Sequence, residues 1–141
     1  MTDKKIFYDS NILIYLVDND FEKKKKASSL LINDYSYIST QAVNENVNIC
    51  ITKLKLNKEE AFNHGKFLLD KFNLIIIDKE IINKAFEISM KYGYSYWDSL
   101  IISSALEKDC DILYSEDMQH SQVIDGRLKI VNPFKIKNYK T

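Results

Sequence analysis

Short apolar runs alternate with longer helix-like segments along this chain, and few folds accommodate such an alternation. The runs that we expect to be strands are residues 5–8, 37–39, 74–77, 112–114 and 129–131, and polar residues bound each of them. Chains with this pattern form parallel strands whose connecting helices cover both faces of one sheet. The pattern therefore predicts the α/β class, as a three-layer α/β/α sandwich around a central, mostly parallel sheet.

Helix signals fill the segments between these runs. The expected helices span residues 11–17, 24–34, 41–54, 57–73, 78–92 and 95–109. Asn57 and Glu60 have the spacing of a capping box, and Gly93 marks a helix end. One proline and three glycines in 141 residues are too few for a turn-dense all-β fold. At this length we expect one domain covering residues 1–141.

The sequence also indicates where such a chain works. Asp9 interrupts the apolar stretch near the N-terminus and no small-residue cleavage site follows, which argues against a signal peptide. No run approaches the roughly 18 apolar residues that a membrane span requires. Cys50 and Cys110 lack ligand-type spacing to each other and to the two histidines, so we interpret them as reduced thiols. We expect a soluble, cytoplasmic protein with no membrane partner.

Four acidic residues lie where a strand ends and a helix or turn begins: Asp9, Glu45, Asp98 and Asp117. The carboxyl ends of parallel strands share one edge of the sheet, and ligand sites of open α/β sheets form at that edge. Carboxylates that converge there raise one another's pKa unless a cation lies between them. Their joint placement therefore favours a site for a hard divalent cation.

Each of these acids also fits a purely local role. Asp9, with Ser10, fits a helix cap, and Asp98 follows Ser95 at the spacing of a capping box. Asp117 fits a turn. Only the joint pattern of four acids favours the metal site over these separate roles.

Several strings of the sequence resemble the motifs of the PIN-domain ribonuclease family. The strings are Phe7-Tyr8-Asp9-Ser10-Asn11, Gln41-Ala42-Val43-Asn44-Glu45, Tyr96-Trp97-Asp98-Ser99-Leu100-Ile101 and Leu113-Tyr114-Ser115-Glu116-Asp117-Met118. The closing segment, residues 131–134, resembles that of the VapC-type toxin group, and the spacing agrees from residue 5 to 134. Each motif alone is weak, whereas the ordered set is specific.

The resemblance implies a PIN-like fold and a site in which Asp9, Glu45, Asp98 and Asp117 bind Mg²⁺ or Mn²⁺. It further implies that Asn11 and Ser115 hydrogen-bond to the metal-binding groups from behind. The implied activity is metal-dependent endoribonuclease cleavage of RNA phosphodiester bonds, leaving 5′-phosphate and 3′-hydroxyl ends. The implied role is the toxin of a type II toxin-antitoxin pair, held inactive by a small antitoxin protein.

The resemblance and the sequence together also lead us to expect a homodimer. Phe62, Phe67 and Phe72 belong to helices with more apolar residues than a monomer of this size should expose. The net charge of zero becomes about +4 if the four acids are assigned to a metal, which mildly favours an RNA partner. The lysines of residues 23–26 either contact phosphates or form a solvated helix face.

Other interpretations remain open at this point. The same fold serves housekeeping RNA-processing nucleases and non-catalytic PIN-like binding modules. A receiver-type signalling domain would need an acidic pair after the first strand, where this chain has Asp9 alone. We expect Glu116 to lie outside the site and His120 to be a solvated loop residue rather than a general base. Trp97 fits base stacking, but core or interface packing is the favoured interpretation.

Overall fold

A computed structural model describes residues 4–31 and 35–135 of the chain, and its centre is one six-stranded sheet. The strands are β1 (Ile6–Tyr8), β2 (Ser36–Ser39), β3 (Asn73–Ile75), β4 (Ile112–Tyr114), β5 (Val123–Ile124) and β6 (Leu128–Val131). They are arranged in the order β3-β2-β1-β4-β6-β5. All neighbours pair in parallel except β5 and β6, which are antiparallel. The predicted mostly parallel sheet is confirmed.

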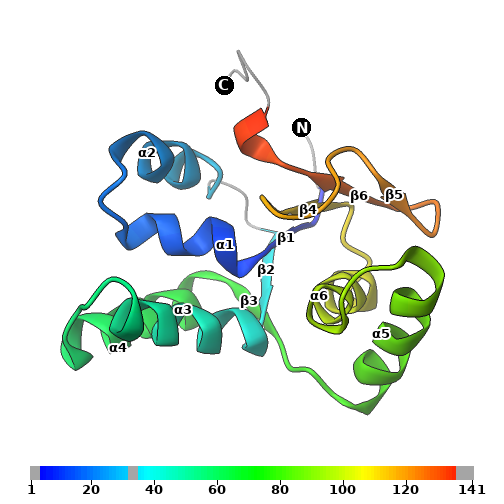
Figure 1. Cartoon of the computed structure of the whole chain (residues 1–141), viewed down its shortest axis with the longest axis horizontal. Helices are drawn as coiled ribbons and strands as arrows, with labels where there is room; N and C mark the ends of the chain where they lie inside the picture. The colour runs from blue at the N-terminus through cyan, green and yellow to red at the C-terminus, as the bar shows by residue number, and fades with distance from the viewer. Residues whose placement is uncertain (1–3, 32–34, 136–141) are drawn as a thin grey trace.

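Helices cover both faces of this sheet. They are α1 (Ser10–Leu13), η1 (Ile14–Val17), α2 (Phe21–Ser29), α3 (Thr40–Thr52), α4 (Lys58–Lys71), α5 (Lys79–Tyr92), α6 (Tyr96–Glu107) and η2 (Pro133–Lys135). The first four α-helices lie on one side of the sheet, and α5 and α6 lie on the other (Figure 1). The three layers confirm the predicted α/β/α sandwich.

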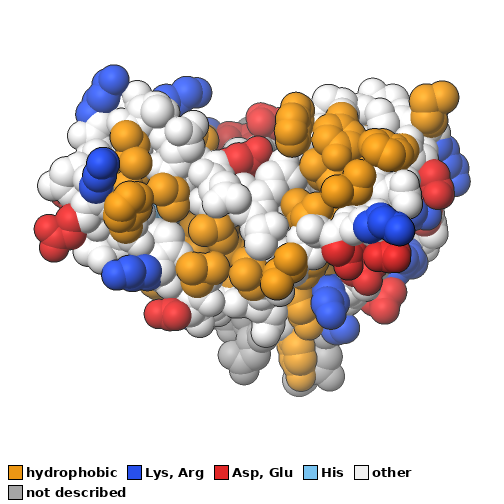
Figure 2. All heavy atoms as spheres, turned by 90° about the horizontal axis from the view of Figure 1, so that it is seen from below, with side chains coloured by type: hydrophobic (Ala, Val, Ile, Leu, Met, Phe, Trp, Pro, Cys, Tyr) orange, Lys and Arg blue, Asp and Glu red, His pale blue; other side chains and the backbone are white. Residues whose placement is uncertain are grey.

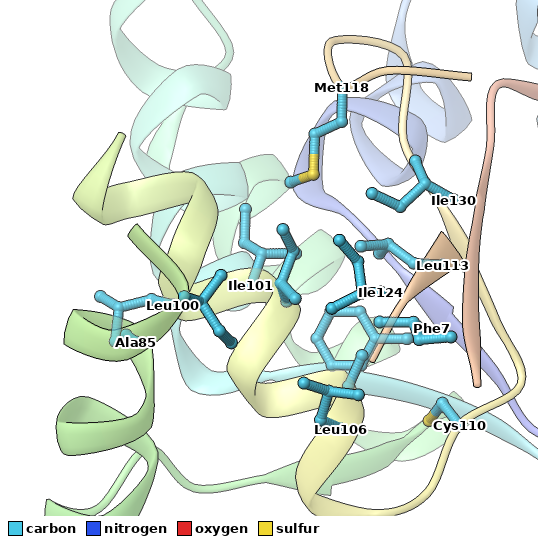
Figure 3. Close-up of a cluster of buried hydrophobic side chains, with 14 of the residues drawn as sticks. Phe7, Ala85, Leu100, Ile101, Leu106, Cys110, Leu113, Met118, Ile124 and Ile130 are labelled. Carbon is cyan, nitrogen blue, oxygen red and sulfur yellow. The ribbon is translucent and has the colours of Figure 1, made fainter. Parts of the chain in front are cut away.

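Side chains alternate between the two faces of the strands, as the two-residue period of a strand requires. Phe7 of β1 and Leu113 of β4 point toward Leu106 and its neighbours on α6 (Figure 3). Ile6 and Tyr8 instead belong to the core beneath the first four α-helices. Because both faces of the central strands are buried, those strands read as continuous apolar runs rather than alternating ones.

Several elements differ from the expectation, most clearly α2 and β5, and the helix expected at residues 11–17 is divided into α1 and η1. The helix expected at residues 24–34 begins at Phe21, because the Asp20 side chain accepts a hydrogen bond from the Lys23 N–H at 3.2 Å and caps the helix. It ends at Ser29, and residues 32–34 of the expected helix lie outside the described residues. Strand β5, which pairs with β6 through a tight turn, was not expected from the sequence.

The apolar surface differs from the expectation at one of three phenylalanines. Phe62 and Phe67 on α4 are 47% and 45% exposed, as the sequence suggested. Phe72 is 5% exposed and packs edge-on against Tyr8, with ring centres 5.3 Å apart. Phe72 therefore belongs to the core and contributes nothing to an exposed apolar surface. In the described part of the chain, every helix is too short or too polar to cross a membrane.

Candidate active site

A cleft of about 610 Å³ is lined by all four predicted acids. Asp9 directly follows β1, Asp117 lies in the loop after β4, and Glu45 is in the second turn of α3, which follows β2. Asp98 is in the first turn of α6. Because β1, β2 and β4 run in parallel, three of the acids come to the same edge of the sheet, and α6 brings the fourth. Acidic side chains are visible in the notch between the two halves of the molecule (Figure 2).

Asp9 is the most deeply buried of the four. It is 4% exposed, and its two carboxylate oxygens accept hydrogen bonds from the Ser10 N–H at 2.6 Å and the Ser115 hydroxyl at 2.8 Å. The pKa of Asp9 is raised to about 7, chiefly by burial and to a smaller extent by the charges of Glu45 and Asp98, while the two hydrogen bonds oppose the shift. Near neutral pH this carboxyl group is therefore partly protonated in the metal-free protein.

Glu45 is held by two residues that the sequence analysis did not assign to the site. The Ser10 hydroxyl donates to one carboxylate oxygen at 2.7 Å, and the Gln41 side-chain amide donates to the other at 3.2 Å. Gln41 stands four residues before Glu45 on the same helix face, a spacing that was available in the sequence. Ser10 precedes Glu45 by 35 residues, so only the fold brings the two together.

Asp98 and Asp117 are less buried than Asp9. The Ser95 hydroxyl accepts a hydrogen bond from the Asp98 N–H at 3.1 Å, so Asp98 takes part in the helix start and also lines the cleft. Burial raises the pKa of Asp98, and the charges of Asp117 and Glu45 add to the rise. Asp117 is exposed, and its N–H donates to the Ser115 hydroxyl at 3.3 Å. Asp98 therefore belongs to the start of α6 and to the lining of the cleft.

Asn11 and Asn132 hold the main chain of the loop that carries Asp117. The Asn11 side-chain oxygen accepts from the Glu116 N–H at 3.2 Å, and the Asn132 amide donates to the Glu116 carbonyl at 3.2 Å. The Glu116 side chain turns to the Tyr15 hydroxyl, at 2.7 Å, and to the Lys23 ammonium group. Glu116 does not line the acidic cleft.

Two further residues have structural surroundings that the sequence did not reveal. His120 Nδ1 accepts a hydrogen bond from the Asn132 N–H at 3.0 Å, and the histidine does not line the cleft. Lys23, the first of the four lysines, lies over the rings of Tyr15 and Phe134 at 4.8 and 4.9 Å. This lysine is therefore part of a packed cluster rather than a solvated face.

The side chains on this cleft fit a hard divalent cation by their chemistry. The four predicted acids supply carboxylates, which Mg²⁺ and Mn²⁺ prefer, and their mutual repulsion is what a cation would relieve. Asp18, which the sequence placed in an exposed loop, and Lys53 are the other charged residues that line the cleft. Among residues 4–31 and 35–135, no group of three or more His, Cys, Asp or Glu side chains is already arranged to hold a metal ion. Binding would therefore require these carboxylates to draw closer together.

The fold and the cleft define an α/β protein with a carboxylate site at the carboxyl edge of a parallel sheet. The model of the PIN domain family matches residues 6–125, and the chain belongs to that family. A search of curated protein sequences finds no match.

Solved structures of similar fold include toxin proteins from several bacteria. A toxin-antitoxin complex from Klebsiella pneumoniae matches with a TM-score of 0.71 and 22% identity, over 94% of this chain and 100% of that chain. VapC20 of Mycobacterium tuberculosis, a sarcin-ricin loop cleaving toxin, matches with a TM-score of 0.68 and 15% identity, over 80% and 90% of the two chains. VapBC2 from Rickettsia felis, bound to a DNA fragment from its promoter, matches with a TM-score of 0.65 and 16% identity, over 90% and 98%. These similarities establish the shared fold.

Proposed function

We propose that this chain is a Mg²⁺- or Mn²⁺-dependent endoribonuclease that hydrolyses RNA phosphodiester bonds. The observation that carries the proposal is that Asp9, Glu45, Asp98 and Asp117, which are far apart in the sequence, line one cleft of a PIN domain. Carboxylates that converge on one cleft repel one another. Their convergence is therefore best explained by a cation that they bind together.

The four acids and the residues that hydrogen-bond to them have separate roles in this proposal. The four carboxylates hold the cation, which supplies Lewis acidity for the activation of water and offsets negative charge on the phosphate. Ser10 and Gln41 fix the two oxygens of Glu45, and Ser115 fixes Asp9. Such supporting hydrogen bonds orient the ligands before a metal binds.

Asp9 must lose its proton to serve as a strong ligand, because only the carboxylate form carries the negative charge that attracts the cation. Asn11 contributes less directly, by holding the main chain of the Glu116 and Asp117 loop. No side chain of the cleft needs to become a covalent nucleophile. We expect products with 5′-phosphate and 3′-hydroxyl ends.

In the cell we propose that the protein acts as the toxin of a type II toxin-antitoxin pair. Structures of similar fold include toxin-antitoxin complexes, and one of the similar proteins is described as a toxin that cleaves the sarcin-ricin loop. A small antitoxin protein is the proposed partner, with RNA as substrate. The proposal includes a cytoplasmic location, a homodimer and one PIN-like domain over residues 1–141.

The test is cleavage of a labelled single-stranded or loop-containing RNA by the purified protein. Cleavage is expected with Mg²⁺ or Mn²⁺ and not with EDTA, and Asp9→Asn or Asp98→Asn should lower the rate by orders of magnitude. Asp70→Asn is the matched control, because Asp70 is an exposed acid on α4 outside the cleft. Equal cleavage with and without EDTA would refute the metal mechanism. RNA binding with no cleavage under any metal condition would instead indicate a non-catalytic binding module.

A further inference from the structure

Trp97 lies in an unusual place for a large aromatic side chain. It directly precedes Asp98 on α6 and is 63% exposed, although the sequence favoured a packed position. It lines the acidic cleft and also a second, smaller pocket beside that cleft. Contact between an exposed indole ring and water is unfavourable in free energy, and a ligand that covers the ring would remove that contact.

The second pocket has a volume of about 340 Å³, which is within the range of small-ligand sites. Ile77, Leu100 and Trp97 form its apolar wall, and Gln41, Asn44 and Glu45 line it from α3. Three of these residues, Gln41, Glu45 and Trp97, line both pockets, so the two hollows lie next to each other. A ligand that enters the acidic cleft therefore has an adjoining pocket of different chemistry within reach.

The position of Trp97 is supported on two sides. The Tyr96 ring packs edge-on against the indole with ring centres 5.2 Å apart, and Tyr96 in turn packs against Phe86 at 5.9 Å. The main-chain carbonyl of Trp97 accepts a hydrogen bond from the Gln41 amide at 3.5 Å. These contacts hold the indole beside the cleft while most of its surface stays exposed.

We propose that this side pocket binds one nucleobase of the RNA, next to the phosphate in the acidic cleft. The base stacks on Trp97 against the apolar wall of Ile77 and Leu100, and the Asn44 amide hydrogen-bonds to its edge. The inference rests on the proposed function, because it assigns a second part of the same substrate.

Three properties of the pocket favour a base over other occupants. Unpaired bases stack on exposed aromatic rings, and each such contact contributes strongly to binding. Asn44 is exposed on α3, and its amide offers both a donor and an acceptor, as the edge of a base requires. The pocket also adjoins the carboxylates, so a chain whose phosphate lies among them places a neighbouring base beside Trp97.

The experiment uses the fact that Trp97 is the single tryptophan of the chain. Short single-stranded RNA is titrated into the wild-type protein with Ca²⁺ in place of Mg²⁺ or Mn²⁺, so that a divalent cation offsets the carboxylate charges while intact RNA is verified on a gel, and indole fluorescence is followed. The same titration is read by the anisotropy of a dye on the RNA. We expect saturable quenching of the indole, and weaker quenching by an otherwise identical oligonucleotide that lacks one base at the stacked position.

Variants separate stacking from general folding effects. Trp97→Ala should weaken RNA binding by about 5- to 150-fold, while Trp97→Phe should lose less because it keeps an aromatic ring. Phe21→Ala is the matched control, because Phe21 is an exposed aromatic on α2 that lines neither pocket, and it should bind RNA as the wild type does. Asn44→Ala should reduce the preference among the four bases without abolishing cleavage.

The possible contrary results are distinct. RNA binding without any change in Trp97 fluorescence, or a Trp97→Ala protein with wild-type affinity, would overturn the subsite and leave the proposed nuclease standing. If Trp97 fluorescence changes with protein concentration in the absence of RNA, Trp97 lies at a contact between two copies of the chain. That result would overturn the proposed base-binding pocket. If no RNA binds and none is cleaved with Mg²⁺ or Mn²⁺, the proposed function fails and the subsite fails with it.

Discussion

Asp9 couples the candidate site to pH through its burial. Its pKa of about 7 in the folded, metal-free protein lies above the ordinary value of 3.8. The folded protein therefore holds this proton between about pH 4 and pH 7 while the unfolded chain has lost it, so metal-free stability from this group falls as pH rises through that range. Metal binding has the opposite dependence, because the cation must displace the proton.

We predict that affinity for Mg²⁺ falls up to about tenfold for each pH unit below about 7. The reason is that only the deprotonated form of Asp9 binds the cation. Isothermal titration calorimetry between about pH 5.5 and pH 8, in buffers of matched ionic strength, measures this dependence. An affinity that stays constant from pH 6 to pH 8 would exclude Asp9 as a ligand that titrates in this range.

A second prediction concerns Asp98, where two roles coexist. In Asp98→Asn the main-chain N–H that bonds to Ser95 is retained, while the repulsion from Asp117 and Glu45 is removed. The metal-free melting temperature should therefore stay equal to that of the wild type or rise. The wild type should gain about 2.7 kcal/mol at Mg²⁺ a hundredfold above its Kd, and the variant should lose most of that gain.

Differential scanning calorimetry with and without Mg²⁺ measures both effects. Asp70→Asn, on the exposed side of α4, should change neither quantity. A lower metal-free melting temperature in Asp98→Asn, together with a full Mg²⁺ stabilisation, would show that Asp98 serves only the helix start.

At the scale of elements, the packing of α3 against α4 helps to position Ser10 and Glu45 of the candidate site. His64 on α4 contacts the Asn46 side-chain oxygen through Nε2 at 2.8 Å, and the Asn46 amide donates to the Ser10 carbonyl at 3.1 Å. Ser10 in turn bonds to Glu45. Burial lowers the pKa of His64, so stability from this group is present above its unfolded pKa and declines as pH falls below it.

Gly65 allows α4 to lie this close to α3. A Cβ atom at residue 65 would come within 2.9 Å of the Val47 Cγ2 atom. We predict that Gly65→Ala destabilises the fold by about 1 kcal/mol, because overpacking of about 1–3 kcal/mol exceeds the helix gain of alanine over glycine of about 1 kcal/mol.

The sign of this effect should reverse when Val47 is shortened. In a Val47→Ala background the same Gly65→Ala change should be neutral or stabilising, because the clash is gone and the helix gain remains. Urea unfolding of the four proteins measures the coupling. Equal effects of Gly65→Ala in both backgrounds would show that Val47 does not limit the approach of the two helices.

At the scale of the whole molecule, exposed apolar residues of α4 lead us to expect a homodimer. Phe62, Phe67 and Leu69 are 47%, 45% and 49% exposed, and apolar side chains also form patches on both halves of the face in Figure 2. Light scattering at micromolar concentration should give twice the mass of one chain, and Phe62→Glu should shift it toward one. Phe21→Glu, on α2, is the control. A wild-type protein with the mass of one chain would contradict this expectation.

The sequence by itself determined the layers of the fold and the chemical character of the site. Apolar runs mark the strands because their residues are buried on both faces, and local polar signals such as Asn57 with Glu60 mark helix starts. Acids that directly follow strands, such as Asp9, point to the edge where ligand sites form. The Asp125-Gly126 pair, with positive φ of 51° and 71°, forms the turn before β6, and this hairpin was not predicted because the partner strand has only two residues.

Only the tertiary structure decided the strand order, the support of the acids and the exposure of single aromatic side chains. Helical periodicity shows which residues share a face, but not whether another element covers that face, so Phe72 is buried while Trp97 is exposed. The hydrogen bond from Ser10 to Glu45 joins residues 35 positions apart, and that from Ser115 to Asp9 joins residues 106 apart. Contacts of this kind depend on how whole elements pack, and no local pattern encodes them.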